Sequence, residues 1–191
     1  MKKIKVFKMS ISEYFPKTHK RAGEPTNFVM QISNVFYGSF PAKLHTMRQN
    51  YSLWKKRIDE VIAGDAILVL FSWSGKPYNS SHHNRFVFGK NTEEIRRFVY
   101  EYYKPHSIDT DCQIILKDNV EIGVQRFELI PDKDGAVSLE WHKIDNHIRK
   151  EVEWQFIANN DGLSSDNWRE WFKNYDLTKP MAIIQLTKFR Y

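Results

Sequence analysis

The segment Gly64-Asp65-Ala66-Ile67-Leu68-Val69-Leu70-Phe71 decides the fold class. Its apolar run, residues 66–71, is the longest in the chain; it has the length of a buried strand and is too short to cross a membrane. A helix is predicted before this run, and Gly64 supplies its stop signal. Its apolar side chains recur at helical spacing: Tyr51, Trp54, Ile58, Val61 and Ile62. A helix that leads into a buried strand predicts a mixed α and β domain.

Further strands and helices are predicted along the rest of the chain. Strand patterns cover residues 4–9, 65–73, 85–88, 112–116, 120–130, 136–141 and 181–189, with a hairpin turn at 132–135. Helix patterns cover residues 25–33, 51–62, 91–103, 147–158 and 164–175. In the helix at 147–158 we expect Ile148, Val152 and Phe156 to face inward. Because no repeat or linker interrupts the chain, we predict a single domain over residues 1–191.

The composition limits the classes of function. The chain has 191 residues and a net charge of +6, which favours polyanionic partners such as nucleic acid. Its one cysteine, Cys112, excludes an internal disulfide and a cysteine-based metal site. No P-loop, dinucleotide-binding glycine pattern or HExxH motif appears, and we expect no metal and no cofactor. Residues 1–8 lack the apolar stretch of a secretory signal. We therefore expect a cytoplasmic protein that does not associate with membranes.

The stretch Lys43-Leu44-His45-Thr46-Met47-Arg48 lies between two predicted helices. If it is extended, alternate residues share a side, so that Thr46 and Arg48 lie together, and a bend brings Lys43 beside them. A hydroxyl beside an amine and a guanidinium suits an anion or a carbonyl group. Burial and a neighbouring cation lower the pKa of a lysine until it serves as a base. The alternative interpretation is a solvated basic turn.

The spacing Lys43-x-x-Thr46-x-Arg48 resembles the K-x-x-T-x-R signature of ASCH domains, a branch of the PUA-like β-barrels. The segment 64–70 resembles the Gly-Asp strand of that family, and Asp161-Gly162-Leu163 with the helix and strand after it resembles the end of the domain. The resemblance implies an α+β fold, a PUA-like mixed β-barrel with helices packed around it and an enlarged insert at about residues 77–153. It also implies a cleft around Lys43, Thr46 and Arg48 that binds RNA or a modified nucleoside.

Some small ASCH proteins are amidohydrolases that remove the acetyl group from acetylated cytidine. The resemblance transfers their lysine base and threonine nucleophile to Lys43 and Thr46. It places their acid near the start of the last helix, at Asp166 or, one turn later, at Glu170. In this alternative Arg48 steadies an anionic intermediate or a phosphate.

Aromatic and basic residues complete the predicted site. We expect Trp73, Lys76 and Tyr78 at the mouth of the cleft, with Tyr78 as the exposed stacking surface. The other tryptophans, Trp54, Trp168 and Trp171, either stack a base or pack in the core, and their helical spacing favours the core. Two basic groups form a phosphate-contacting rim or are simply solvated faces: Lys17, Lys20 and Arg21, and Lys55, Lys56 and Arg57.

Overall fold

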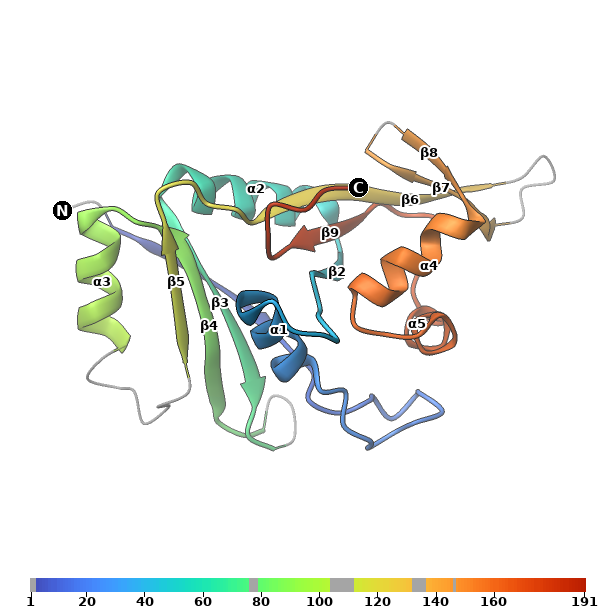
Figure 1. Ribbon diagram of the computed structural model, residues 1–191, viewed down its shortest axis with the longest axis horizontal. Helices are drawn as coiled ribbons and strands as arrows, with labels where there is room; N and C mark the ends of the chain where they lie inside the picture. Colours follow the sequence, from blue (N-terminus) through green and yellow to red (C-terminus); the bar gives the residue numbers. More distant parts are fainter. Residues whose placement is uncertain (1–2, 76–78, 104–111, 132–136, 146) are drawn as a thin grey trace. The chain divides into compact units, whose positions relative to one another are not determined.

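The computed structural model describes residues 3–75, 79–103, 112–131, 137–145 and 147–191. The strands of this part are β1 (Lys5–Ser10), β2 (His45–Gln49), β3 (Ala66–Trp73), β4 (His82–Lys90), β5 (Gln113–Lys117), β6 (Gly123–Pro131), β7 (Val137–Ile144), β8 (His147–Lys150) and β9 (Met181–Gln185). The helices are α1 (Phe28–Tyr37), α2 (Tyr51–Ala63), α3 (Glu93–Tyr103), α4 (Glu151–Asn160) and α5 (Ser165–Phe172) (Figure 1). The mixed α and β class is therefore as predicted.

The chain divides into two compact units. Unit 1 comprises Met1–Glu13 and Lys56–Ile122, and unit 2 comprises Tyr14–Lys55 and Gly123–Tyr191. One boundary between them falls inside α2. The boundaries of the insert expected from the family resemblance, at about residues 77 and 153, do not coincide with those of either unit.

Unit 1 contains a mixed sheet with the strand order β1-β3-β4-β5. β1 and β3 run parallel, as do β4 and β5, whereas β3 and β4 are antiparallel. Parallel neighbours need a crossover connection, and α3 supplies it between β4 and β5 (Figure 1). Residues 66–70 of β3 are completely buried, as the apolar run predicted. The core of the unit is formed by Ile4, Ile67, Val69, Val87, Ile95 and Val99.

Unit 2 contains an antiparallel sheet with the strand order β2-β9-β6-β7-β8. β9 lies between β2 and β6, and all five of its residues are buried. The indole of Trp168, on α5, is 1% exposed and packs against the rings of Trp154, Phe127 and Phe172 at centroid distances of 5.8, 6.3 and 4.7 Å. Trp168 is therefore a core residue, in agreement with its helical spacing.

The described strands form two open sheets, and no closed barrel is found among them. The Gly-Asp strand, β3, lies in the sheet of unit 1, whereas the terminal strand, β9, pairs with β2 and β6 in unit 2. A barrel of the expected kind requires these strands in one continuous hydrogen-bonded ladder. The predicted hairpin turn at 132–135 lies outside the described residues.

The helix predicted over 147–158 begins later than expected, because the chain first forms β8 and pairs it with β7. Asp145 has a left-handed φ of 54°, which turns the backbone sharply before β8. α4 then buries Trp154 and Ile157, whereas Phe156 is 60% exposed. The prediction that Phe156 faces inward is wrong.

α1 also begins later than the sequence pattern indicated. Asn27 has a left-handed φ of 60°, so the helix starts only at the next residue, and Gly38 ends it with a φ of 65°. Phe28 and Ile32 of this helix are buried. The shifted helix places the next polar residue of its inner face, Gln31, toward the segment that precedes β2.

Candidate functional site

Thr46 and Arg48 lie on one face of β2, as expected for an extended segment. In the antiparallel register, Thr46 pairs with Ile184 of β9 and Arg48 pairs with Ala182. The guanidinium Nη1 of Arg48 donates to the hydroxyl oxygen of Thr46 at 2.8 Å and to the carbonyl of Met47 at 2.8 Å. The hydroxyl thus accepts a charge-assisted hydrogen bond, which holds the two side chains together.

Lys43 is held just before β2 by the backbone of two other segments. Its N–H donates to the carbonyl of Gln31 at 3.0 Å, and the N–H of Leu44 donates to the carbonyl of Asn160 at 2.7 Å. The Lys43 side chain is buried, and its Nζ donates both to the carboxylate and to the backbone carbonyl of Asp161. The same ammonium lies 4.2 Å from the centre of the Phe28 ring.

Burial dominates the electrostatics of this cluster. It lowers the pKa of Lys43 and raises the pKa of Asp161, while the attraction between the two groups opposes both shifts. Burial also lowers the pKa of Arg48, and the negative charge of Asp161 opposes that shift too. One carboxylate therefore balances two cations, the buried Lys43 and the half-buried Arg48.

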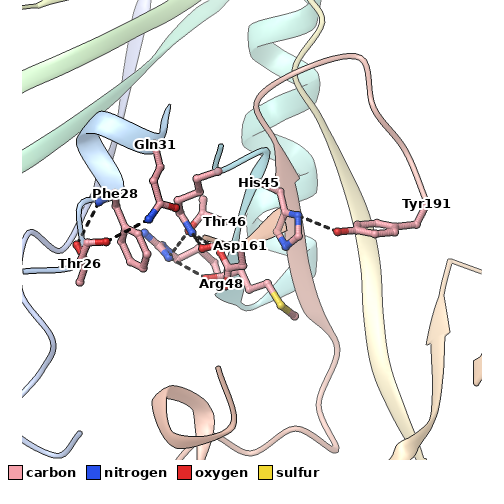
Figure 2. A network of polar contacts seen from close by, with 10 residues as sticks. Thr26, Phe28, Gln31, His45, Thr46, Arg48, Asp161 and Tyr191 are labelled. Atoms are coloured by element: carbon pink, nitrogen blue, oxygen red, sulfur yellow. Dashed lines mark hydrogen bonds and ion pairs between the residues drawn. The ribbon is translucent and has the colours of Figure 1, made fainter. Parts of the chain in front are cut away.

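Figure 2 shows Gln31 beside the cluster formed by Thr46, Arg48 and Asp161. Its side-chain nitrogen donates to the carbonyl of Thr26 at 3.3 Å. Its amide oxygen Oε1 is buried and has no hydrogen-bond partner within the described ranges. A buried acceptor without a partner is costly, so it marks a place where a donor is expected.

Gly162 allows the backbone to place Asp161 beside Lys43. Its φ is +77°, and a Cβ on this residue would lie 2.2 Å from Oε1 of Gln31 and 3.3 Å from Cβ of Lys43. Only glycine combines this backbone conformation with so close an approach. The glycine is therefore part of the architecture of the site.

We expect Gly162→Ala to destabilise the protein by about 2–5 kcal/mol, because a left-handed conformation and steric overlap act together. Gly23 is the matched control, since its φ is +83° and nothing lies within 4 Å of an added Cβ. Gly23→Ala should lose only about 1–2 kcal/mol. Urea unfolding of both variants measures the difference. Equal losses would contradict the close packing at Gly162.

The structure brings Lys43, Thr46 and Arg48 together but supplies a different acid from the two predicted ones. Asp166 is exposed on α5, and Glu170 forms an ion pair with Lys173 at 2.5 Å. The carboxylate that reaches Lys43 belongs to Asp161. The signal for it in the sequence is the Asp161-Gly162-Leu163 stretch, where a carboxylate directly precedes a glycine.

The predicted mouth residues are partly described. Trp73 is half-buried in unit 1, and its ring packs edge-on against Phe71 at 5.3 Å and His82 at 6.0 Å. Nε2 of His82 lies 2.9 Å from the Nζ of Lys8. Unit 1 thus carries an aromatic group beside a lysine. The other two mouth residues, Lys76 and Tyr78, lie outside the described residues.

The predicted basic rim consists of side chains in different environments. Lys17 and Lys20 are exposed in unit 2, whereas Arg21 forms an ion pair with Glu24 at 2.7 Å and lies 4.5 Å above the Phe15 ring. On α2, Lys55 and Lys56 are exposed and Arg57 is half-buried, 5.5 Å from the Phe7 ring.

Unit 2 has a shallow hollow beside α5. Its volume is about 310 Å³, and its lining includes Trp168, Phe172 and Tyr175. None of its lining residues belongs to the cluster of Lys43, Thr46, Arg48, Asp161 and Gln31. A larger groove in unit 1, of about 1180 Å³ between β1 and α3, contains none of the residues predicted for the site.

Comparison of the chain with protein-family models, with curated proteins and with solved structures gave no match. In the part of the chain that the structure describes, no three His, Cys, Asp or Glu side chains are grouped so that they could hold a metal ion. The same part contains no helix with the length and apolar character needed to span a bilayer.

Proposed function

We propose that this chain is a binding module for RNA or a modified nucleoside, and that the cluster of Lys43, Thr46, Arg48, Asp161 and Gln31 is its binding site. The observation that carries the proposal is the unpartnered amide oxygen of Gln31 beside the Arg48–Thr46 pair. An acceptor next to a guanidinium and a hydroxyl complements the mixed donor and acceptor edge of a base or its carbonyl and phosphate groups.

The roles within this site follow from the contacts. Arg48 offers a planar cation suited to phosphate or to a carbonyl, and Thr46 offers a hydroxyl. The amide oxygen of Gln31 accepts from an amino or imino group. Lys43 and Asp161 are committed to each other, so their role is to hold the segment before β2 in place.

The kinship with ASCH and PUA-like domains is part of the same proposal. It is supported by the order of the motifs in the chain and by the pairing of the signature strand with the closing strand, β2 with β9. The net charge of +6 supports a polyanionic partner.

A second candidate is an amidohydrolase that acts on an N-acylated nucleoside such as acetylated cytidine. It is favoured by the meeting of a hydroxyl, an amine and a carboxylate in one cluster, with Asp161 as the acid. In this alternative Lys43 first gives one proton to Asp161, and its free amine takes the proton of the Thr46 hydroxyl as that oxygen attacks the acyl carbon. For that step the Nζ of Lys43 must break its hydrogen bond to the Asp161 carboxylate and form one with the Thr46 hydroxyl. The C–N bond then breaks, the amine of the nucleoside leaves with that proton, and water releases acetate from Thr46.

One experiment tests the binding function through its dependence on salt. Affinity for a single-stranded RNA should fall on the order of tenfold for about a fourfold rise in salt, as release of counterions from a few phosphates requires. Replacing Lys55, Lys56 and Arg57 with glutamate should weaken binding further. The control replaces Arg96, Arg97 and Lys117, which are exposed cations of unit 1, with the same charge change.

The outcomes of this titration separate the alternatives. If RNA does not bind at low salt, and neither cytidine nor acetylated cytidine binds, the binding function is excluded. Release of acetate from acetylated cytidine, lost in Thr46→Ala, would instead establish the amidohydrolase. If the two triple variants weaken binding equally, the predicted rim on α2 is not where phosphates bind.

A further inference from the structure

His45 lies on the face of β2 opposite Thr46 and Arg48, and its side chain is completely buried. Its Nδ1 lies 3.1 Å from the phenol oxygen of Tyr191, and the side-chain nitrogen of Asn160 donates to the same oxygen at 3.0 Å. Of these two partners, only Nδ1 of His45 can accept, so we assign the phenol proton to the bond with His45. The imidazole proton is then on Nε2.

Two buried polar atoms on this face have no hydrogen-bond partner within the described ranges. They are Nε2 of His45 and Oε1 of Gln185, and both side chains are 0% exposed. His45 and Gln185 are directly paired across β2 and β9, so the two atoms belong to neighbouring side chains on one face of the sheet. A donor and an acceptor left unpaired in the interior indicate a missing partner with both kinds of group.

Tyr191 covers the buried side chain of His45. Its ring lies edge-on to His45 at 5.6 Å and to Phe189 at 5.0 Å, and its N–H donates to the side-chain oxygen of Gln125 at 2.9 Å. Burial raises the pKa of the Tyr191 phenol and lowers the pKa of His45 well below its usual value, so both groups are neutral at pH 7. The ring is therefore held by neutral hydrogen bonds, which a ligand with similar groups can replace.

Within the described ranges, the segment that carries Tyr191 pairs with no strand. β9 ends at Gln185, and the last backbone bond of this region to the neighbouring strand segment runs from the N–H of Leu186 to the carbonyl of Leu44. Beyond it, the N–H of Phe189 donates to the side chain of Thr187 within the same segment. The Arg190 guanidinium lies close to Gly123 of β6, and Tyr191 itself is attached through its side chain and the Gln125 amide.

We propose that the pocket occupied by Tyr191, formed by His45, Asn160, Gln125 and Gln185, is a subsite for a single-ring base of a nucleoside or RNA. Among the pyrimidines, uracil presents a ring carbonyl next to its N3–H. The carbonyl accepts from Asn160 and the N–H donates to Nδ1 of His45, so that one base repeats both bonds of the phenol. Tyr191 then competes with the ligand for the pocket. This inference rests on the proposed function, because it names the kind of base.

The subsite selects by size. The pocket is filled by one six-membered ring, so a two-ring purine needs additional space. Of the remaining groups of uridine, the second ring carbonyl is an acceptor and the ribose hydroxyls are donors, the two kinds of partner that Nε2 of His45 and Oε1 of Gln185 lack.

The test compares binding of uridine and adenosine to the wild type and to Tyr191→Ala by calorimetric titration. A ligand that must displace Tyr191 binds with an affinity reduced by the fraction of molecules with an open pocket. Tyr191→Ala should therefore bind uridine about tenfold more tightly than the wild type, with little change for adenosine. Tyr191→Phe, which keeps the ring but loses both hydrogen bonds, should lie between them.

Asn160→Ala, added to Tyr191→Ala, should cancel the gain in uridine affinity. This variant keeps the backbone carbonyl that accepts from Leu44. Thermal unfolding identifies folded variants, and His45→Phe serves as a second pocket variant. The inference is overturned if Tyr191→Ala binds uridine no more tightly than the wild type, or if its affinity for adenosine rises by the same factor. It is also overturned if adding Asn160→Ala leaves the gain in uridine affinity unchanged. If RNA binding still depends on Arg48 in that case, the subsite fails and the proposed function stands.

Discussion

Asp161→Asn is expected to lower the free energy of unfolding by about 3–5 kcal/mol, the loss typical of a buried ion pair deprived of one partner. The variant leaves the Lys43 ammonium buried without its countercharge, although the bond to the backbone carbonyl of residue 161 is kept. The asparagine has nearly the same volume as the aspartate, so packing changes little. Urea unfolding at neutral pH measures the loss.

Asp166→Asn is the matched control, because it makes the same chemical change on an exposed carboxylate five residues further along the chain. We expect a change within about 0.5 kcal/mol for this substitution. Losses of similar size in the two variants would show that Asp161 does not compensate the charge of Lys43.

The loss in Asp161→Asn should depend on pH. Burial already lowers the pKa of Lys43 and the attraction of Asp161 opposes that effect, so removing Asp161 lowers the pKa further. A lysine whose folded pKa is below its unfolded value binds more protons in the unfolded state, and stability then rises with pH. The variant should therefore recover stability as pH rises from the folded pKa toward 10.5. A deficit that grows over this range would contradict the assignment.

Arg48→Ala is expected to weaken binding of RNA or nucleoside by about ten- to a hundredfold. A hydrogen bond to a charged group contributes about 1.5–3 kcal/mol, and about 1.4 kcal/mol corresponds to a tenfold change in affinity. Arg48→Lys should recover only part of the loss, because the ammonium keeps the charge but not the planar fork that bonds Thr46 and Met47. Fluorescence anisotropy with a labelled single-stranded RNA measures each affinity.

Arg97→Ala controls for the loss of one positive charge. Arg97 is exposed on α3 in unit 1, where it forms an ion pair with Glu93 at 3.1 Å. Its replacement should change affinity by less than about threefold, since an exposed and paired cation far along the sequence contributes only to the general field. Equal losses for Arg48→Ala and Arg97→Ala would mean that binding follows net charge and not this site. Circular dichroism confirms that each variant is folded before it is titrated.

Local patterns in the sequence were sufficient for much of the fold. The run at 66–71 predicted a buried strand, and residues 66–70 of β3 are completely buried. Helical spacing and Gly64 predicted α2, and alternation placed Thr46 and Arg48 on one face of β2. These features depend on the 3.6-residue and two-residue periods of the backbone, which link each residue only to its near neighbours. Where a left-handed residue intervened, as at Asn27 or Asp145, the predicted ends of the helices were displaced.

The site itself was decided by the tertiary structure. Lys43 meets Asp161 across 118 positions of the chain, and His45 meets Tyr191 across 146. Neither pairing has a local signal in the sequence. An aspartate before a glycine is common at the end of a helix, and nothing in the residues around Tyr191 indicates which side chain its ring contacts. The pairing of β9 with β2 and the packing of Gly162 against Gln31 bring these segments together. The sequence alone therefore determined which residues of β2 share a face, while long-range packing determined which carboxylate and which ring those residues meet.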